Sequence, residues 1–457
     1  LTVMTFLGAG MLSGISAQVS PLQVDTLEET KIPDQWDLQS CIDYAKEQNI
    51  TIRKNRITAV STQIDVKTAK AAMFPSLSFS TGQQVVNRPY QETSSRVSGS
   101  EIISSNSKTS YNGNYGLNAS WTLYNGNKRL KTIQQEKLNN QMAELDVATS
   151  ENNIQESITQ VYIQILYAAE SVKVNENTLQ VSIAQRDRGQ ELLNAGSIAK
   201  SDLAQLEAQV STDRYQLVTA QATLEDYKLQ LKQLLELDGE NEMNIYLPAL
   251  SDENVLAPLP TKRDVYISAL SLRPEIEASK LNVEASELGI NIAKSSYFPT
   301  ISLSAGIGTN HTSGSDFTFG EQVKNGWNNS IGLSVSVPIF NNRQTKSAVQ
   351  KAKLQYETSI LSLLDEQKAL YKTIESLWLD ANSAQQRYAA ANEKLKSTQI
   401  SYELISEQFN LGMKNTIELL TEKNNLLQAQ QEQLQAKYMA ILNTQLLKFY
   451  QGDQLAI

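Results

Sequence analysis

Residues 69–78 read Ala-Lys-Ala-Ala-Met-Phe-Pro-Ser-Leu-Ser, and residues 293–302 read Ala-Lys-Ser-Ser-Tyr-Phe-Pro-Thr-Ile-Ser. Two further motifs recur at a common offset of 216 residues, from Tyr124 to Phe340 and from Gly196 to Gly412. Each copy combines the alternating pattern of strands with the periodicity of very long helices. The chain of 457 residues is therefore predicted to be an internal duplication with pseudo-symmetric halves.

The composition argues against several classes of protein. Mean hydropathy is −0.35, and no segment reaches the roughly 18 apolar residues that a membrane helix needs. The net charge of −9 argues against nucleic acid or an anionic lipid surface as the main partner. An apolar run at residues 1–13 ends in small residues, and it predicts a signal peptide remnant over residues 1–17, cleaved near Ala17.

The sequence carries no pattern typical of catalysis. Cys41 is the single cysteine and His311 the single histidine, and they lie far apart in the chain. We find no phosphate loop, no nucleophile with a histidine base, no metal-ligand cluster and no supported carboxylate pair. We therefore expect no enzyme activity, no cofactor and no metal site, and we interpret Cys41 as a small apolar residue of a helix.

Two segments, residues 75–124 and 299–340, each predict a pair of strands joined by an outer loop (about 88–110 and 309–329). Apolar and aromatic side chains fall on one face of these strands, and Ser, Asn and Gly fall on the other. The residues of the apolar face that we expect to contact lipid are Leu77, Phe79, Tyr115, Leu117, Trp121, Leu123, Ile301, Leu303, Leu333, Val335 and Val337.

Four strands per chain set a condition on assembly. The smallest barrels that span a bilayer have about eight strands, and the open edges of a sheet cannot lie in lipid. Strands of about 10 residues cross a bilayer when tilted, so closure would need several chains. A soluble sheet with one buried face shows the same alternation. The membrane interpretation is favoured because the helices have seams of their own and residues 1–17 predict a secretory signal.

Very long helices follow each strand pair, from about residues 128 to 193 and 344 to 411. At 1.5 Å per residue each reaches about 100 Å. Their apolar spacing averages 3.5 residues, which predicts left-handed coiled coils. Each helix turns at a glycine, Gly196 or Gly412, and a return helix follows. Polar residues are frequent in the seam of the second return helix, where they either set the register or mark a seam that slides or partly opens.

These patterns divide the chain into consecutive segments. The helical hairpins cover residues 125–237 and 341–450. The other predicted segments are an extended stretch at 18–37, a helix at 38–74, a linker with several prolines at 238–262, a helix at 263–298 and a C-terminal tail at 451–457.

Four motifs in this order carry a resemblance to a known family. They are Trp36–Ala45, Leu272–Ile276, Tyr297–Leu303 and Gly332–Phe340, and with them the chain resembles the TolC-like outer-membrane efflux channels over nearly its whole mature length. The resemblance implies a mixed membrane α+β fold. It would be a homotrimeric 12-stranded outer-membrane β-barrel, with four strands per chain, continued by a long periplasmic α-helical coiled-coil barrel.

The same resemblance implies a function and partners. Such a channel is a passive exit duct in the outer membrane of a Gram-negative bacterium, with a large periplasmic portion. It serves a tripartite efflux or type I secretion system and conducts drugs, toxins, ions or secreted protein. Its partners would be a periplasmic adaptor protein, an inner-membrane pump and outer-membrane lipid, with no nucleic acid.

In the family, the hairpin tips face the adaptor and close the entrance. The resemblance assigns adaptor contact to Ala195, Gly196, Ser197, Leu411, Gly412 and Met413. Asp202 and Glu418 match acidic residues of the constriction, and Lys414 matches a basic latch residue. Carboxylates contributed by each chain around a narrow pore would favour cations. The alternative is that both acids only stabilise helix N-termini.

Two positions of the expected entrance depart from the family pattern. Phe409 stands where the latch often has a tyrosine hydroxyl, and Thr421 stands where a second acidic residue is found. We therefore expect an entrance that is held closed less tightly, or by different contacts.

Other functions remain open at this stage. A trimeric coiled-coil spacer without a pore, acting as a structural or adhesive protein, would also have heptads and strands, but it gives no reason for hairpins that return toward the membrane. Within the family, a type I secretion duct and a metal-efflux duct are alternatives, although no Met-rich or His-rich seam favours metals.

Overall fold

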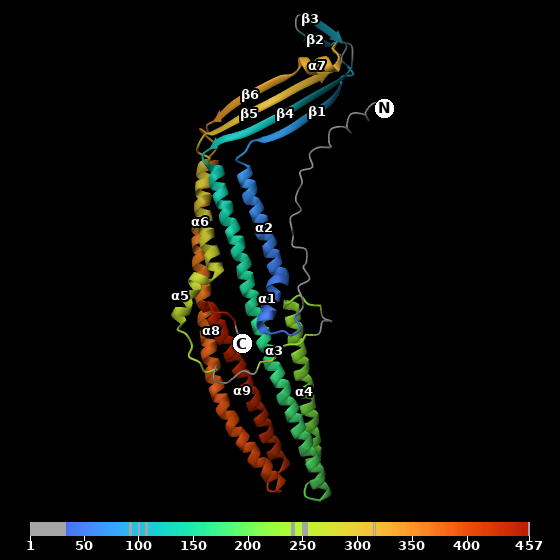
Figure 1. The fold of residues 1–457 in the computed structure, drawn as a ribbon, viewed down its shortest axis with the longest axis vertical. Coiled ribbons are helices and arrows are strands. Elements are labelled where there is room, and N and C mark those ends of the chain that lie inside the picture. The colour runs from blue at the N-terminus through green and yellow to red at the C-terminus, as the bar shows by residue number, and fades with distance from the viewer. Residues whose placement is uncertain are drawn as a thin grey trace.

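The computed structural model describes residues 33–90, 94–98, 101–105, 108–238, 243–248, 255–313, 315 and 317–455. The expected signal remnant and its cleavage point lie outside the described residues, as do most of 18–37, parts of the linker at 238–262 and the last two residues of the tail. Figure 1 shows an elongated molecule in which a sheet lies at one end and long helices run from it to two hairpin tips.

The sheet contains two strands from each copy of the repeat. Its strands are β1 (Ser76–Asn87), β4 (Thr109–Asn125), β5 (Thr300–Thr312) and β6 (Asn328–Ser336), antiparallel in the order β1-β4-β5-β6. The copies therefore meet where β4 pairs with β5. Within the described residues, the outer edges of β1 and β6 have no pairing strand.

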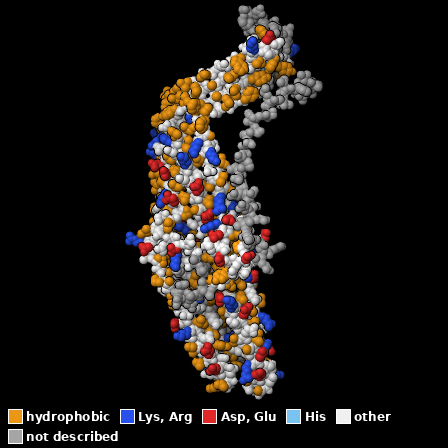
Figure 2. Space-filling model, viewed as in Figure 1, with side chains coloured by type: hydrophobic (Ala, Val, Ile, Leu, Met, Phe, Trp, Pro, Cys, Tyr) orange, Lys and Arg blue, Asp and Glu red, His pale blue; other side chains and the backbone are white. Residues whose placement is uncertain are grey.

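The register separates an apolar face from a polar one, because residues directly opposite each other point to the same side. Phe79 lies opposite Leu117 and Leu303 opposite Leu333, while Ser78 lies opposite Asn118. The register places the expected lipid-facing residues on one face, with the exceptions of Leu123 and Val337. Phe79 and Leu333 are 66% and 65% exposed, so this apolar face is uncovered in the single chain. Figure 2 shows the hydrophobic side chains gathered over the sheet, with charged ones along the helices.

Two of the expected lipid-facing residues leave the alternation. The β4–β5 register shifts between Thr122 and Tyr124, so that Tyr124 rather than Leu123 lies opposite Ile301. The extra residue of a β-bulge has no partner across the ladder, which breaks the two-residue period. At the same end of the sheet, where Thr300 pairs with both Asn125 and Ser336, β6 ends at Ser336 and Val337 lies beyond it. Pro338 follows at once, and proline has no N–H to continue a ladder.

The two outer loops contain structure that the sequence analysis did not predict. In the first loop, β2 (Ser94–Ser98) pairs with β3 (Glu101–Ser105) as a separate hairpin. In the second loop, the short helix α7 (Phe319–Asn325) begins with a capping box between Thr318 and Glu321. Reciprocal caps of this kind satisfy the free N–H groups that otherwise disfavour so short a helix.

Each long helical hairpin consists of a very long helix, a short turn and a shorter return helix. In the first hairpin, α3 (Lys128–Asn194) turns into α4 (Lys200–Leu234), and in the second, α8 (Gln344–Asn410) turns into α9 (Thr416–Gln451). Helices α3 and α8 both have 67 residues, and α4 and α9 have 35 and 36. Among the described residues, no helix is long and apolar enough to cross a membrane.

The two helices that precede the strands are each broken, where the sequence analysis expected continuous helices at 38–74 and 263–298. In the first copy, α1 (Leu38–Gln48) and α2 (Ile50–Ala71) are separated by Asn49, whose ψ is 126° and whose side chain accepts a hydrogen bond from the Thr51 N–H at 2.9 Å. Asn49 therefore ends one helix and N-caps the next.

The second copy is broken at the matching place by different chemistry. Helices α5 (Lys262–Leu272) and α6 (Pro274–Ser295) meet at Arg273, whose ψ is 123°. A residue before proline is pushed out of the helical region, and proline itself suits the first position of a helix. Both breaks leave 11 residues before them and 22 after them, so the interruption belongs to the repeat.

The main apolar core lies near the middle of the long axis, where α1 packs against α3 of the first hairpin and residues of α9 and the linker also contribute. Trp36 forms an isolated parallel bridge with Ile245, and the Tyr162 hydroxyl donates to the Tyr246 carbonyl oxygen at 2.6 Å. Cys41 is fully buried in this core, and burial raises the pKa of its thiol to about 12. Such a thiol stays protonated and unreactive, consistent with its interpretation as a packing residue.

Arg273 joins three helices in the middle of the molecule. Its guanidinium forms ion pairs with Glu156 of α3 at 3.1 Å and with Glu275 at 2.8 Å, and it lies 4.2 Å from the Tyr450 ring of α9. A planar guanidinium suits this combination of carboxylate pairing and ring stacking, which lysine could not reproduce. The side chain that marks the break between α5 and α6 thus ties that break to both hairpins.

Candidate functional site at the hairpin tips

Both hairpins turn through the same backbone motif. Gly196 and Gly412 have φ values of +74° and +75°, a conformation that glycine adopts without strain. The N–H of Ser197 donates to the Leu192 carbonyl at 2.8 Å, and the N–H of Met413 donates to the Gln408 carbonyl at 2.8 Å. These six-residue hydrogen bonds define a Schellman turn at the end of each long helix.

The tips expose the residues that the resemblance assigned to adaptor contact. Those residues are Ala195, Gly196, Ser197, Leu411, Gly412 and Met413, and every one is exposed. In the second tip, the large apolar side chains of Leu411, Met413 and Ile417 lie on the surface, which leaves an apolar end available to a partner.

Asp202 and Glu418 occupy the same position in the two return helices, the third residue of the first turn. The Asp202 carboxylate accepts from the Ala199 N–H at 3.0 Å, and the Glu418 carboxylate accepts from the Asn415 N–H at 3.2 Å. Only the second copy completes a capping box, because the Asn415 side chain also accepts from the Glu418 N–H at 2.9 Å. Each acid thus stabilises the N-terminus of its own helix.

Lys414 and Glu418 form the one ion pair at the tips among the expected gate residues. Their Nζ and Oε1 atoms are 2.5 Å apart, four residues apart in sequence. The hydrogen bond from Lys414, with the Asn415 N–H, lowers the pKa of the Glu418 carboxyl below its ordinary value. In the single chain Lys414 therefore neutralises an acid of its own hairpin.

The two remaining gate candidates also make contacts within their own hairpin. Phe409 is buried, 4% exposed, and packs inside the second tip. Thr421 donates its hydroxyl to the Ile417 carbonyl at 2.7 Å. Of the five candidates, the structure brings Lys414 and Glu418 into contact and leaves Asp202, Phe409 and Thr421 in separate environments.

Above the tips lies a buried polar cluster that the sequence analysis did not predict. Lys423 of α9, Asp213 of α4 and Ser182 of α3 are 3%, 2% and 2% exposed. The Lys423 ammonium donates to both the Asp213 carboxylate and the Ser182 hydroxyl, and that hydroxyl donates to Asp213. We call these three residues the buried triad. Burial lowers the pKa of the Lys423 ammonium below its ordinary value, since a charge away from water is disfavoured.

Two further hydrogen bonds join the hairpins near the buried triad. Gln209 of α4 donates to the Asn424 side chain of α9 at 3.3 Å, and it also donates to Asp213 of its own helix at 2.9 Å. Gln185 of α3 donates to the Tyr402 hydroxyl of α8 at 2.8 Å. Asp213 and Asn424 are polar residues at seam positions that are otherwise mostly apolar, and such positions are the signal that a sequence offers. The sequence gives no signal that Lys423 is buried, since a lysine beside a seam normally reaches solvent.

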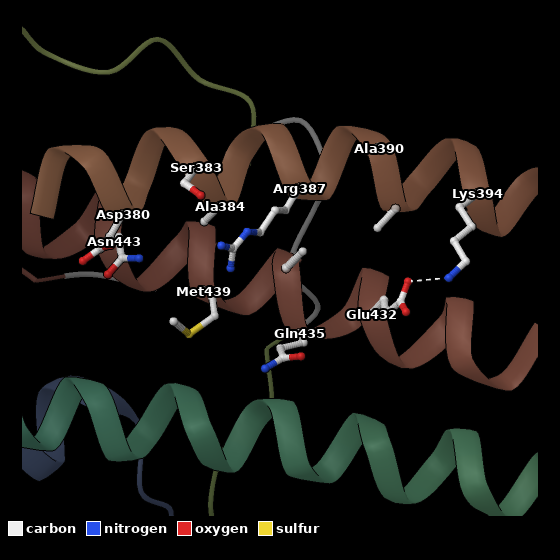
Figure 3. Close-up of a pocket in the computed structure, with 12 residues that line it drawn as sticks. Asp380, Ser383, Ala384, Arg387, Ala390, Lys394, Glu432, Gln435, Met439 and Asn443 are labelled. Atoms are coloured by element: carbon white, nitrogen blue, oxygen red, sulfur yellow. Dashed lines mark hydrogen bonds and ion pairs between the residues drawn. The ribbon is translucent and has the colours of Figure 1, made fainter. Parts of the chain in front are cut away.

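A groove of about 570 Å³ runs along the second hairpin, well above its tip (Figure 3). It is lined by small side chains such as Ala384, Ala391 and Ala436, and Arg387 points into it. Lys394 and Glu432 form an ion pair at 2.7 Å beside it. No gate residue lies there, and among the described residues no group of His, Cys, Asp and Glu side chains could hold a metal ion.

An open sheet with one uncovered apolar face, joined to two long hairpins with exposed tips, is the class of fold that the described residues define. The family model described as "Outer membrane efflux protein" matches residues 41–236 and 265–452, more than half of the chain. The chain belongs to this family. The two matches lie in the two copies of the repeat, and the family places the chain in the outer membrane, with a large periplasmic portion.

Curated relatives support the assignment. The chain is 24% identical over 299 residues to the outer membrane efflux protein BepC of Brucella suis biovar 1 (strain 1330), covering 65% of this chain and 62% of that protein. It is 24% identical over 291 residues to the outer membrane protein TolC of Escherichia coli (strain K12), covering 62% and 58%. The aligned region thus spans about six tenths of each relative's length.

Solved structures share the fold. A structure of CusC, solved to follow folding and transmembrane channel formation, has a TM-score of 0.77 at 18% identity. The match covers 91% of this chain and 92% of the CusC chain. The outer membrane protein VceC of Vibrio cholerae has a TM-score of 0.74 at 16% identity, covering 92% and 97%. Identities this low establish the architecture alone.

Proposed function

We propose that this chain is the outer-membrane exit duct of a tripartite efflux or type I secretion system. It would passively conduct small molecules, such as drugs, toxins or ions, or a secreted protein. The observation that carries the proposal is the four-stranded sheet, which has one uncovered apolar face and two unpaired edges and is joined to a pair of duplicated hairpins.

The sheet supports closure by three chains. Unsatisfied edge amides are costly in lipid, so β6 of one chain must pair with β1 of the next. Three chains would give a barrel of twelve strands, with the face of Leu117 and Leu333 outward and the Ser and Asn face lining a wet interior. The six hairpins would continue this barrel into the periplasm.

The tips support a docking role for a periplasmic adaptor, which would connect the duct to an inner-membrane pump. The duct would supply no chemistry and no energy of its own. Asp202 and Glu418 would lie around the entrance, and Lys414 would help to hold it closed. Phe409 and Thr421 supply no further charge there, so the latch would depend on Lys414.

Reconstitution in planar bilayers tests the proposal. We expect discrete single-channel currents from purified trimers. A trimer that inserts and never conducts would instead indicate the structural or adhesive spacer. Crosslinking from Ala195→Cys or Asn415→Cys variants in cells, followed by identification of the captured protein, tests the adaptor contact.

The entrance has its own test. Lys414→Ala trimers should conduct better than wild type and be more selective for cations, because the Glu418 carboxylates lose their neutralising partners. Conductance no higher than that of wild type would show that Lys414 is not a latch.

A further inference from the structure

The buried triad joins the two hairpins of one chain. Lys423 comes from the second hairpin, while Asp213 and Ser182 come from the two helices of the first. A lysine and an aspartate buried together are stable only while they are paired, because each alone would be an uncompensated charge away from water. Separating the hairpins at this level would therefore break the pairing of both charges at once.

The duplication shows what stands at the equivalent positions. At the common offset of 216 residues, Lys423 corresponds to Glu207, Asp213 to Ala429 and Ser182 to Thr398. None of the three residues is repeated, and the acid–base pair is replaced by an acid and a methyl group. The backbones of the copies match residue for residue over these helices, so the difference lies in the side chains.

This difference matters in a closed ring of hairpins. In the proposed trimer, first and second hairpins alternate, so seams within a chain alternate with seams between chains. A seam between chains would bring Glu207 from one chain toward Ala429 and Thr398 from the next. It would thus lack the ion pair, and it would also lack the counterpart of the Gln209–Asn424 hydrogen bond.

We propose that the buried triad fixes the two hairpins of each chain into one rigid unit, so that the entrance opens along the three seams between chains. Lys423, Asp213 and Ser182 are then positioning residues for gating, without contact with the cargo. Because the inference rests on the proposed duct and its trimer, its test must separate a failure of the inference from a failure of the duct.

Crosslinks at matched positions provide that test. Gln209→Cys with Asn424→Cys places two thiols across the seam within a chain, where the native side chains are in contact at 3.3 Å. The counterparts at the same offset are Asn425 and Ala208, so Asn425→Cys with Ala208→Cys spans the seam between chains. A short bismaleimide joins either pair, and the buried Cys41 thiol does not compete. Denaturing gels distinguish the products, since only crosslinks between chains give covalent oligomers.

The readout is the largest single-channel conductance of each variant before and after crosslinking. We expect the crosslink within a chain to leave this conductance unchanged, and the crosslink between chains to lower it about tenfold by holding the constriction shut. An equal loss with both crosslinks, or a loss only with the one within a chain, would overturn the inference. Absence of current before any crosslinking would instead overturn the duct itself.

The same pairs in the background of Lys423→Met with Asp213→Leu give a second measurement. Without the ion pair, both seams should open, and the crosslink within a chain should then also lower the largest conductance. If this crosslink still has no effect, the triad is not what holds the hairpins together.

Discussion

The first and second hairpins have nearly the same backbone and different polar chemistry. Helices α3 and α8 have 67 residues each and end in glycine turns with φ values one degree apart. Yet Lys423 in the second hairpin corresponds to Glu207 in the first, and the N-cap Asn415 corresponds to Ala199. The shared backbone fixes length and turn, which a ring of hairpins requires, while the side chains are free to make alternate seams different.

The largest expected effect comes from breaking the buried triad. Lys423→Met leaves the Asp213 carboxylate buried without its cation, which should destabilise the chain by about 3–5 kcal/mol. Lys423→Met combined with Asp213→Leu should restore most of that loss, because it removes both buried charges. Thermal unfolding in detergent measures the difference.

Lys394→Met is the control for this experiment. The Lys394–Glu432 pair lies half exposed on the second hairpin, and such pairs contribute less than about 1 kcal/mol. If Lys423→Met and Lys394→Met destabilise the chain equally, the buried triad contributes no more to stability than an exposed ion pair does.

The two turn glycines should respond alike. Gly196→Ala and Gly412→Ala each place a Cβ at positive φ, at a cost of about 1–2 kcal/mol, and the added methyl has no steric neighbour in either tip. Hydrogen exchange of the tip amides measures the local loss. A clear difference between the two variants would mean that the turns are less equivalent than their backbones.

The helix caps should respond oppositely. Asn415→Ala removes the cap of α9 and should weaken its first turn by about 1 kcal/mol, whereas Ala199→Asn should strengthen the first turn of α4 by about the same amount. Amide exchange in the two first turns provides the measurement. A gain on α4 without a matching loss on α9 would contradict the assignment of Asn415 as the cap.

The smallest effect concerns pH. Because the pKa of Glu418 is lowered by Lys414 and the Asn415 N–H, its contribution to folding is present above the ordinary carboxyl pKa and is lost as pH falls. Exchange protection of the first turn of α9 should therefore decrease as pH falls below the ordinary carboxyl pKa of 4.5. Glu418→Gln should show no such dependence, and a dependence that survives this substitution would point to another group.

Much of the architecture could be predicted from sequence because it depends on local signals. Heptad spacing and Gly196 located the first hairpin, and alternation located the strands of the sheet. The break at Arg273 could also be predicted, since Pro274 follows it. The matching break at Asn49 depends on a hydrogen bond to the asparagine side chain, and asparagine also occurs in helix interiors.

The buried triad could not be predicted, for a physical reason. Periodicity reports which side of a helix is buried, and it places Asp213 in the seam of its helix. It does not report which side chain of another hairpin, more than 200 residues away, lies against that position. A charge at the margin of a seam reaches either solvent or a buried partner, and only the packing of three helices decides between them. The outer hairpin of β2 and β3 was missed because its two strands have only five residues each and are rich in serine.

The unpaired edges of β1 and β6 have a consequence for biogenesis. In the proposed trimer, a lone chain cannot enter the bilayer without exposing edge amides to lipid, so insertion and association become a single event. The yield of inserted duct should then rise more steeply than in proportion to chain concentration, as expected for a reaction of several molecules. Until that event each chain would carry two edges able to pair with any extended segment, so we expect a chaperone to escort it.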